Sequence, residues 1–270
     1  MKKTISLVML GFLLCSPAWG TTLLDIDWAT GNTSSATNIK DGVFTYCSLG
    51  STDASNQFGI GTGDGPGGRN YLVVKQGGLT CILSDTSPSM NNPSTIYVRF
   101  WFRKHTHFGS NCHMFMLYSS GHNTGEMYIM RGYSNGFSFI PSLSDSNYAF
   151  NYTGTLNLNQ WYRLEYKILN AGTSNATVSV RLDGENIDDY LISDHLGGDL
   201  DSKAGTLTIP SLNYVNVTSY NSWSGTILDI AGLKITDGPD WIGDGSDTIP
   251  NGSDTVSPAI PSGVITGIIE

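Results

Sequence analysis

The chain has 270 residues, of which 23 are acidic and 14 basic, and a formal charge of −9 at pH 7. This acidic balance excludes nucleic acid as a general partner, because a phosphate backbone is bound by a surplus of lysine and arginine. The length suits one large all-β domain or two small ones.

Residues 1–20 have the three parts of a secretory signal peptide. The basic start MKK precedes the apolar run TISLVMLGFLLC, which is too short to span a bilayer, and Ala18 and Gly20 are the small residues of a cleavage site. A lipoprotein would instead acylate Cys15, but the residues before it lack the small side chain that such a signal favours. We predict an exported bacterial protein, secreted or periplasmic. Its mature chain starts at residue 21 and keeps 12 basic and 23 acidic residues.

Thirteen short strand-like runs follow, separated by turn clusters such as GDGPGG and SPSMNNP, and almost no stretch has a helical period. No later segment has the unbroken apolar length of a transmembrane helix. The pattern predicts an all-β fold, a two-sheet antiparallel jelly-roll sandwich over residues 21–242. The predicted strands are 22–28, 42–49, 70–76, 78–84, 95–105, 113–120, 126–133, 137–143, 160–169, 176–184, 187–193, 207–217 and 226–237.

The run YVRFWFRKH at 97–105 has two different faces. Val98, Phe100 and Phe102 form one row and are expected to point into the core. The alternate residues Tyr97, Arg99, Trp101, Arg103 and His105 then point away from it. The strand therefore carries tryptophan, histidine and two arginines on the face opposite the core.

Two later strands repeat this alternation. In 161–168 the inward residues are Tyr162, Leu164, Tyr166 and Ile168, and in 177–183 they are Val178, Val180 and Leu182. Tryptophan offers a flat face for a sugar ring, and arginine offers a planar fork for carboxylate or sulfate. The predicted carbohydrate-binding residues are Arg99, Trp101, Arg103, His105, Arg163, Glu165, Lys167 and Arg181. The alternative is a set of cross-strand ion pairs, with Trp101 covered by a loop.

The end of the chain and the cysteines carry weaker signals. Residues 243–270 are rich in Gly, Ser, Pro and Asp without periodicity, which predicts a tail or linker and a candidate contact for a protein partner. The mature chain keeps three cysteines, and we predict a Cys47–Cys81 disulfide that leaves Cys112 over.

The segment NQWYRLEYKILNAGTSNATVSVRLDGE at 159–185 resembles a recurrent segment of the concanavalin A-like lectin/glucanase superfamily, which includes laminin-G-like modules. TILDIAGLKITDGPDWIG resembles the last strand of such domains, and TIYVRFWFRKH resembles their central strand. The resemblance covers residues 22–242. It implies a jelly roll of two curved sheets whose concave sheet usually forms a saccharide groove. We expect the outward face of 97–105 to form the floor of that groove.

The leading functional prediction is a secreted, lectin-like carbohydrate-binding or adhesive module for an anionic polysaccharide. Glycoside hydrolysis needs two carboxyl groups, and the Glu-x-Asp-x-Glu pattern of related glucanases is missing. The enzymatic alternative is a polysaccharide lyase acting on a uronate-containing glycan, with Arg103, His105 and Tyr118 as candidate catalytic residues. A third alternative is a non-catalytic structural protein of the envelope or extracellular space.

Calcium is the one cofactor that the sequence suggests. The loops TGDGPGG and GGDLDSKAG offer Asp64, Asp199 and Asp201 as candidate ligands. Calcium takes six to eight oxygen ligands, and neither loop supplies them alone.

Overall fold

The fold is that of a computed structural model of the chain. It describes residues 21–26, 28, 46–47, 58–75, 82–85, 90, 92–107, 113–119, 126–133, 135–142, 149–193, 197–203, 205, 207, 209, 212, 214–220, 226–238 and 240–242. The predicted signal peptide and tail lie outside these residues. Cys81 lies outside them as well, so the Cys47–Cys81 disulfide stays a prediction.

Two eight-stranded sheets make up the fold, and every described strand pair is antiparallel. The β6 sheet has the order β13 (Glu185–Asn186), β12 (Thr177–Leu182), β11 (Trp161–Leu169), β6 (Thr95–Lys104), β16 (Thr226–Thr236), β4 (Tyr71–Lys75) and β3 (Phe58–Gly61), with β1 (Thr22–Ile26) also paired to β16. The β8 sheet has the order β14 (Leu191–Ser193), β10 (Phe150–Tyr152), β9 (Gly136–Ile140), β8 (Glu126–Tyr133), β7 (His113–Tyr118), β15 (Tyr214–Tyr220), β5 (Ile82–Asp85) and β2 (Tyr46–Cys47). The predicted all-β two-sheet sandwich is confirmed.

Within the described residues, helix is confined to single turns. They are η3 (Pro66–Gly68), η5 (Asp188–Tyr190) and α1 (Leu200–Lys203). None of the helices in the described part of the chain has the length and hydropathy that crossing a bilayer requires.

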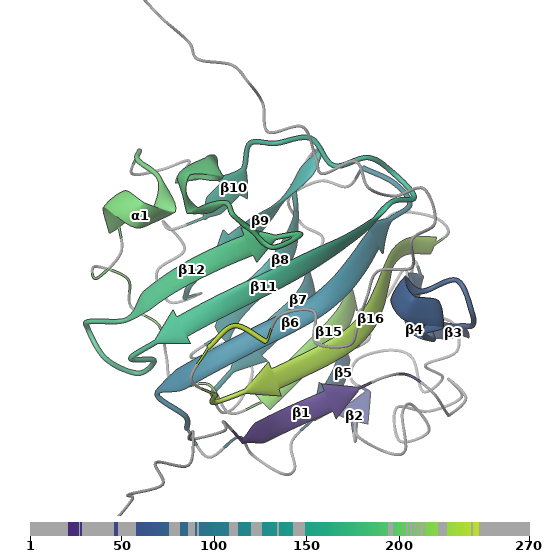
Figure 1. The fold of residues 1–270 in the computed structure, drawn as a ribbon, viewed down its shortest axis with the longest axis horizontal. Coiled ribbons are helices and arrows are strands. Elements are labelled where there is room, and N and C mark those ends of the chain that lie inside the picture. Colours follow the sequence, from purple (N-terminus) through teal and green to yellow (C-terminus); the bar gives the residue numbers. More distant parts are fainter. Residues whose placement is uncertain are drawn as a thin grey trace, which may run out of the picture.

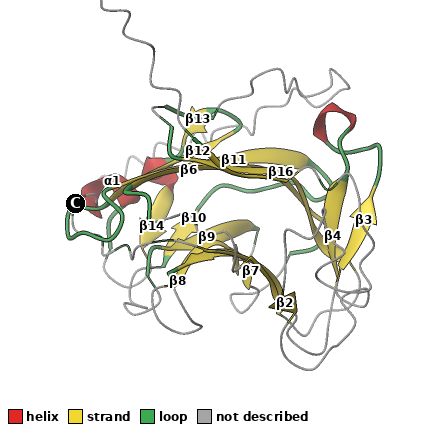
Figure 2. Cartoon of the chain, turned by 90° about the horizontal axis from the view of Figure 1, so that it is seen from below, coloured by secondary structure: helices red, strands yellow, loops and turns green. Residues whose placement is uncertain are grey.

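The two sheets lie face to face as curved layers (Figures 1 and 2). Figure 2 shows that the β6 sheet bends around the β8 sheet where it reaches β4 and β3. The outward face of the β6 sheet is therefore on the convex side of the sandwich.

The core lies between the layers, and the period-2 alternation builds it. Val98, Phe100 and Phe102 of β6 are buried there, as are the predicted inward residues of β11 and β12. Phe100 packs edge-on against Phe115 of the other sheet, with ring centroids 5.1 Å apart. The Tyr166 hydroxyl donates to the Ile129 carbonyl at 2.6 Å, which joins the sheets through the core.

Two predicted strands need correction. The predicted strand 207–217 begins too early, because Leu207 forms only an isolated bridge with Ala176 and the strand itself is β15. The predicted strand 187–193 starts with the turn η5, in which buried Asp188 accepts a hydrogen bond from the Val180 amide. Only its last three residues form β14.

Candidate functional site

The predicted carbohydrate-binding face is the outward face of the β6 sheet, but it is not an open groove floor. Trp101 is 1% exposed, and Arg99, Arg163 and Glu165 are buried as well. The expectation of an exposed stacking surface on the concave side is therefore wrong at the centre of this face. The reason is that β6 is a central strand, and other segments pack on its second face.

Trp101 is covered by two arginine side chains, one from the loop before β4 and one from β6 itself, and by the neighbouring strand. The guanidinium carbons of Arg99 and Arg69 lie 4.5 and 5.5 Å from the ring centroid. The register of β16 against β6 shifts between Ala231 and Lys234, and within this bulge Gly232 has φ 53°. A Cβ at Gly232 would stand 2.7 Å from the indole ring, so the bare backbone packs against the tryptophan.

Charged residues pair across the middle of the face. Glu165 stands opposite Arg99 on one side and Arg181 on the other. Its Oε2 also lies 3.3 Å from Nε of Arg163. The register thus sets Glu165 between arginines of both neighbouring strands, as in the alternative that the sequence offered, whereas its ion pair with Arg163 lies within β11.

At the other end of the face, the segment after β16 turns back over the sheet (Figure 1). The Arg181 guanidinium lies 4.2 Å from the Trp241 ring centroid, and the Tyr97 and Trp241 rings meet edge-on at 6.3 Å. Lys167 places its ammonium 5.9 Å from the Tyr97 ring. Both predicted cations at this end are therefore half-buried against aromatic rings.

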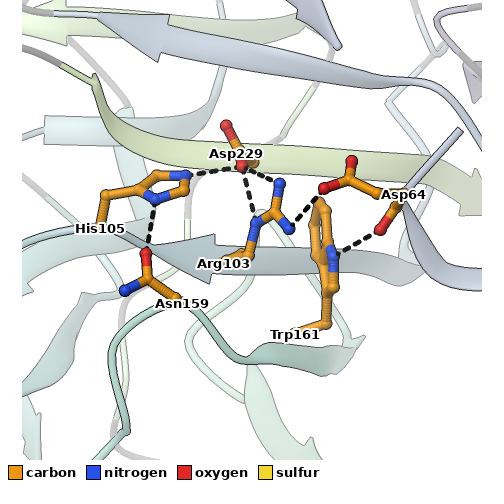
Figure 3. A network of polar contacts seen from close by, with 6 residues as sticks. All are labelled: Asp64, Arg103, His105, Asn159, Trp161 and Asp229. Atoms are coloured by element: carbon orange, nitrogen blue, oxygen red, sulfur yellow. Dashed lines mark hydrogen bonds and ion pairs between the residues drawn. The ribbon is translucent and has the colours of Figure 1, made fainter. Parts of the chain in front are cut away.

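The partly exposed end of the face forms the arrangement drawn in Figure 3, which we call the Arg103 cluster. Arg103 stands near the end of β6, and His105 follows directly after the strand. Trp161 on β11 and Asp229 on β16 are the residues opposite Arg103 in the two neighbouring strands. The cluster consists of the residues drawn there, Asp64, Arg103, His105, Asn159, Trp161 and Asp229, together with Tyr71, which the figure does not draw.

Asp229 is the anchor of the cluster. It is 1% exposed, and its Oδ2 accepts hydrogen bonds from Nε and Nη2 of Arg103 at 2.8 and 2.7 Å. Nε2 of His105 lies 2.7 Å from the same oxygen, and Nδ1 of His105 lies 2.8 Å from Oδ1 of Asn159. One buried carboxylate oxygen therefore orients both the guanidinium and the imidazole.

Asp64 reaches the cluster from the glycine-rich loop before β4. Its Oδ2 accepts a hydrogen bond from Nη1 of Arg103 at 3.0 Å, and its backbone carbonyl accepts one from Nε1 of Trp161 at 3.1 Å. The Tyr71 hydroxyl also bonds to the Asp64 carboxylate. Asp64 is thus held at three points, by three different side chains.

Two aromatic rings flank the guanidinium. The Arg103 carbon lies 4.6 Å from the Trp161 ring centroid and 5.1 Å from that of Tyr71. The two rings meet edge-on at 5.4 Å. The side chain of Arg103 is accordingly locked between a buried carboxylate and two partly exposed aromatic rings.

The cluster shifts the ionisation of its members. The hydrogen bond to Asp229 raises the pKa of His105, and burial opposes this only in part. Because both ring nitrogens face acceptor oxygens, the arrangement satisfies the imidazolium. Partial burial raises the pKa of Asp64, but hydrogen bonds from Tyr71 and Arg103 outweigh it, so the pKa of Asp64 lies below its usual value.

The structure regroups the predicted site residues. Arg103 and His105 were assigned to the sugar-binding face and Asp64 to calcium, and all three meet in one cluster. Four residues of the cluster were not predicted as site residues: Tyr71, Asn159, Trp161 and Asp229. The signal for Asp229 was present, since a lone carboxylate stands between apolar residues in the last strand.

The structure separates the candidates for lyase and metal chemistry. Tyr118 lies on β7 of the other sheet, so it does not join Arg103 and His105. Asp199 caps the turn α1, where its Oδ1 accepts from the Ser202 amide at 2.7 Å, and Asp201 lies within that turn. Figure 1 places α1 and the loop of Asp64 at opposite edges of the β6 sheet. Among the described residues no group of three His, Cys, Asp or Glu could hold a metal ion, and calcium stays a prediction.

Comparison with solved structures identifies the fold. The chain is similar to a cellulose-induced protein, Cip1, at 19% identity over 82% of this chain and 100% of that one, with a TM-score of 0.54. It is also similar to domain 4 of AbnA, a GH43 extracellular arabinanase from Geobacillus stearothermophilus solved with arabinotriose, at 12% identity over 82% and 94% of the two chains (TM-score 0.47). A third similar structure is the alginate lyase Aly36B, at 13% identity over 78% and 95% (TM-score 0.42).

The sequence itself gives no further match. No family model matches the chain, and no curated protein matches it. The structural likeness therefore shows the fold alone, a two-sheet β-sandwich of the kind that the sequence predicted.

Proposed function

We propose that the protein is an exported carbohydrate-binding module and that it binds its glycan at the Arg103 cluster. The observation that carries this proposal is a fixed guanidinium set between two partly exposed aromatic rings at the surface of the sandwich. The concanavalin A-like fold supports a carbohydrate-related role. The resemblance of the sequence to a lectin and glucanase superfamily supports it too, and the signal peptide at 1–20 adds a secreted or periplasmic location to the proposal.

The cluster has the parts that sugar recognition needs. A pyranose ring has an apolar face that can lie on an aromatic ring, and its hydroxyls need donors and acceptors in fixed positions. Trp161 and Tyr71 offer the rings, Arg103 offers donors, and the exposed Asp64 and Asn159 offer acceptors. Because Asp229 already fixes Arg103, binding loses little side-chain entropy there.

The geometry of the cluster supports glycan binding better than lyase catalysis. A lyase base must accept a proton from the sugar ring, whereas His105 has both nitrogens engaged with acceptors and a raised pKa. Both ring nitrogens point at acceptor oxygens of the protein, so neither offers a free lone pair to a sugar. We therefore propose lectin-like or adhesive binding rather than catalysis.

Replacing Trp161 tests the site. We expect Trp161→Ala to weaken glycan binding about tenfold or more, because it removes an aromatic surface worth roughly 1.5 kcal/mol in stacking. The measurement is calorimetric titration with the oligosaccharides selected on a glycan array that holds neutral and uronate-containing chains.

Trp241→Ala is the matched control, since it removes a tryptophan from the other end of the same face. It should bind as the unmodified protein does. The proposal fails if the protein binds no glycan on the array, or if Trp161→Ala binds normally while Trp241→Ala does not.

A further inference from the structure

We infer that the Asp64 carboxylate occupies the place of a ligand carboxylate on Arg103, so that the site takes a glycan built from uronates. The inference rests on the proposed function, because it concerns the same site. It goes further by naming the group that the site recognises and the internal residue that this group displaces.

The two carboxylates on Arg103 are not equivalent. Asp229 is almost fully buried and takes Nε and Nη2, whereas the Asp64 side chain is 59% exposed and takes Nη1 alone. An exposed ion pair contributes little, since water competes for both charges. Asp229 therefore fixes the guanidinium, while the contact with Asp64 can be exchanged for another carboxylate.

The donors around the Asp64 side chain already form a binding position for a carboxylate. Its carboxylate takes one hydrogen bond from Nη1 of Arg103 and one from the Tyr71 hydroxyl. A ligand carboxylate in the same place would meet the same two donors. A uronate carries its carboxylate on the pyranose ring, so one sugar residue could bind these donors and lie against Trp161 at the same time.

Asp64 can leave without dismantling the loop. Trp161 donates to the backbone carbonyl of Asp64 and not to its carboxylate, so a rotation of the side chain preserves that contact. The loop is closed separately by the hydrogen bond from the Gly65 amide to the Arg69 carbonyl at 3.2 Å. Displacement thus needs a change of side-chain rotamer and no refolding of the backbone.

A neutral glycan would use Asp64 in the opposite way. Its hydroxyls would donate to the exposed carboxylate, and removing the carboxylate would weaken binding. For a uronate, removal of Asp64 takes away an internal competitor and a repelling charge, and binding should strengthen. The sign of the effect of Asp64→Asn therefore separates the two ligand classes.

The experiment compares the unmodified protein with Asp64→Asn and Asp64→Ser by calorimetric titration. The probes are oligogalacturonate and oligomannuronate, their methyl-esterified forms, and acetate. We expect both variants to bind one of the acidic oligosaccharides about two- to fivefold more tightly than the unmodified protein, which is the range for losing one exposed ion pair. The methyl esters should bind weakly to all three proteins, and acetate should show no measurable heat.

Glu185→Gln is the charge-matched control. It removes one exposed negative charge from β13, at the far edge of the same sheet, and should leave all affinities unchanged. An equal gain in Glu185→Gln would overturn the inference, because net charge would then explain the effect. Weaker or unchanged uronate binding in Asp64→Asn would overturn it too, as would equal affinity for the acid and its methyl ester, or acetate binding as tightly as the oligosaccharide.

The outcome also separates this inference from the proposed function. If the protein binds neutral oligosaccharides and Asp64→Asn weakens them, the site is a glycan site of the other class and only the inference fails. If none of the proteins binds any glycan, both fail together.

Discussion

Replacing Asp229 with asparagine removes the anchor of the Arg103 cluster while it conserves the shape of the side chain. Oδ2 of Asp229 accepts three hydrogen bonds, two from Arg103 and one from His105, at 2.7–2.8 Å. Oδ1 has no hydrogen-bond partner among the described residues, so the stabilisation passes through one oxygen. An amide can still accept at its oxygen, but it is neutral and cannot offset the charge of Arg103 or of a protonated His105.

The expected loss is large because the carboxylate is buried. Removing one partner of a buried ion pair costs about 3–5 kcal/mol, and the lower end applies because Arg103 is 13% exposed and water can reach it. A loss of about 3 kcal/mol in the free energy of unfolding corresponds to a fall of about 6–12 °C in Tm for a domain of this size. The pKa of His105 should fall toward its usual value, because its hydrogen bond to Asp229 is the largest cause of the rise.

Urea unfolding measures the first effect, and an NMR titration of the His105 ring protons measures the second. The two results must occur together if Asp229 orients both cations. A variant that unfolds within about 0.5 kcal/mol of the unmodified protein, or that retains the raised pKa of His105, would refute this reading of the cluster.

Two further changes test the packing of β6. Gly232→Ala should cost about 2–4 kcal/mol in urea unfolding, because φ is positive there and a methyl group would collide with Trp101; an unchanged midpoint would contradict the packing. Burial lowers the pKa of Lys104 from 10.5 to about 8. Between these two pH values the unfolded chain binds more protons than the folded protein, so the free energy of unfolding should increase as the pH rises. Subtracting the pH profile of Lys104→Met isolates this gain, and a difference that does not rise over that interval would count against the burial of the ammonium.

The core was predictable because burial follows the local period of the chain. Every residue expected to point inward in 97–105, 161–168 and 177–183 lies in the core. A strand whose apolar and polar side chains alternate can bury its apolar row on one face only, and that rule needs no knowledge of distant segments. The two-sheet architecture follows from the same signal repeated over many short strands.

The site was less predictable because distant segments build it. Alternation shows that Trp101 points away from the core, but not that Arg69 and a bulge at Gly232 pack on it. Asp64 is 39 positions from Arg103 in the sequence, and Asp229 is 124 positions from His105. Only the register of β16 and the path of the loop before β4 bring them together. The outward face therefore combines a covered centre with one partly exposed end.

The most direct measurement is a crystal structure of the protein with a bound acidic oligosaccharide. Our account predicts a uronate ring against Trp161, its carboxylate on Nη1 of Arg103 and on the Tyr71 hydroxyl, and the Asp64 side chain turned away. The contacts of Arg103 with Asp229 should be unchanged. A glycan bound elsewhere, for example on the β8 sheet, with the contact between Asp64 and Arg103 intact, would contradict the account.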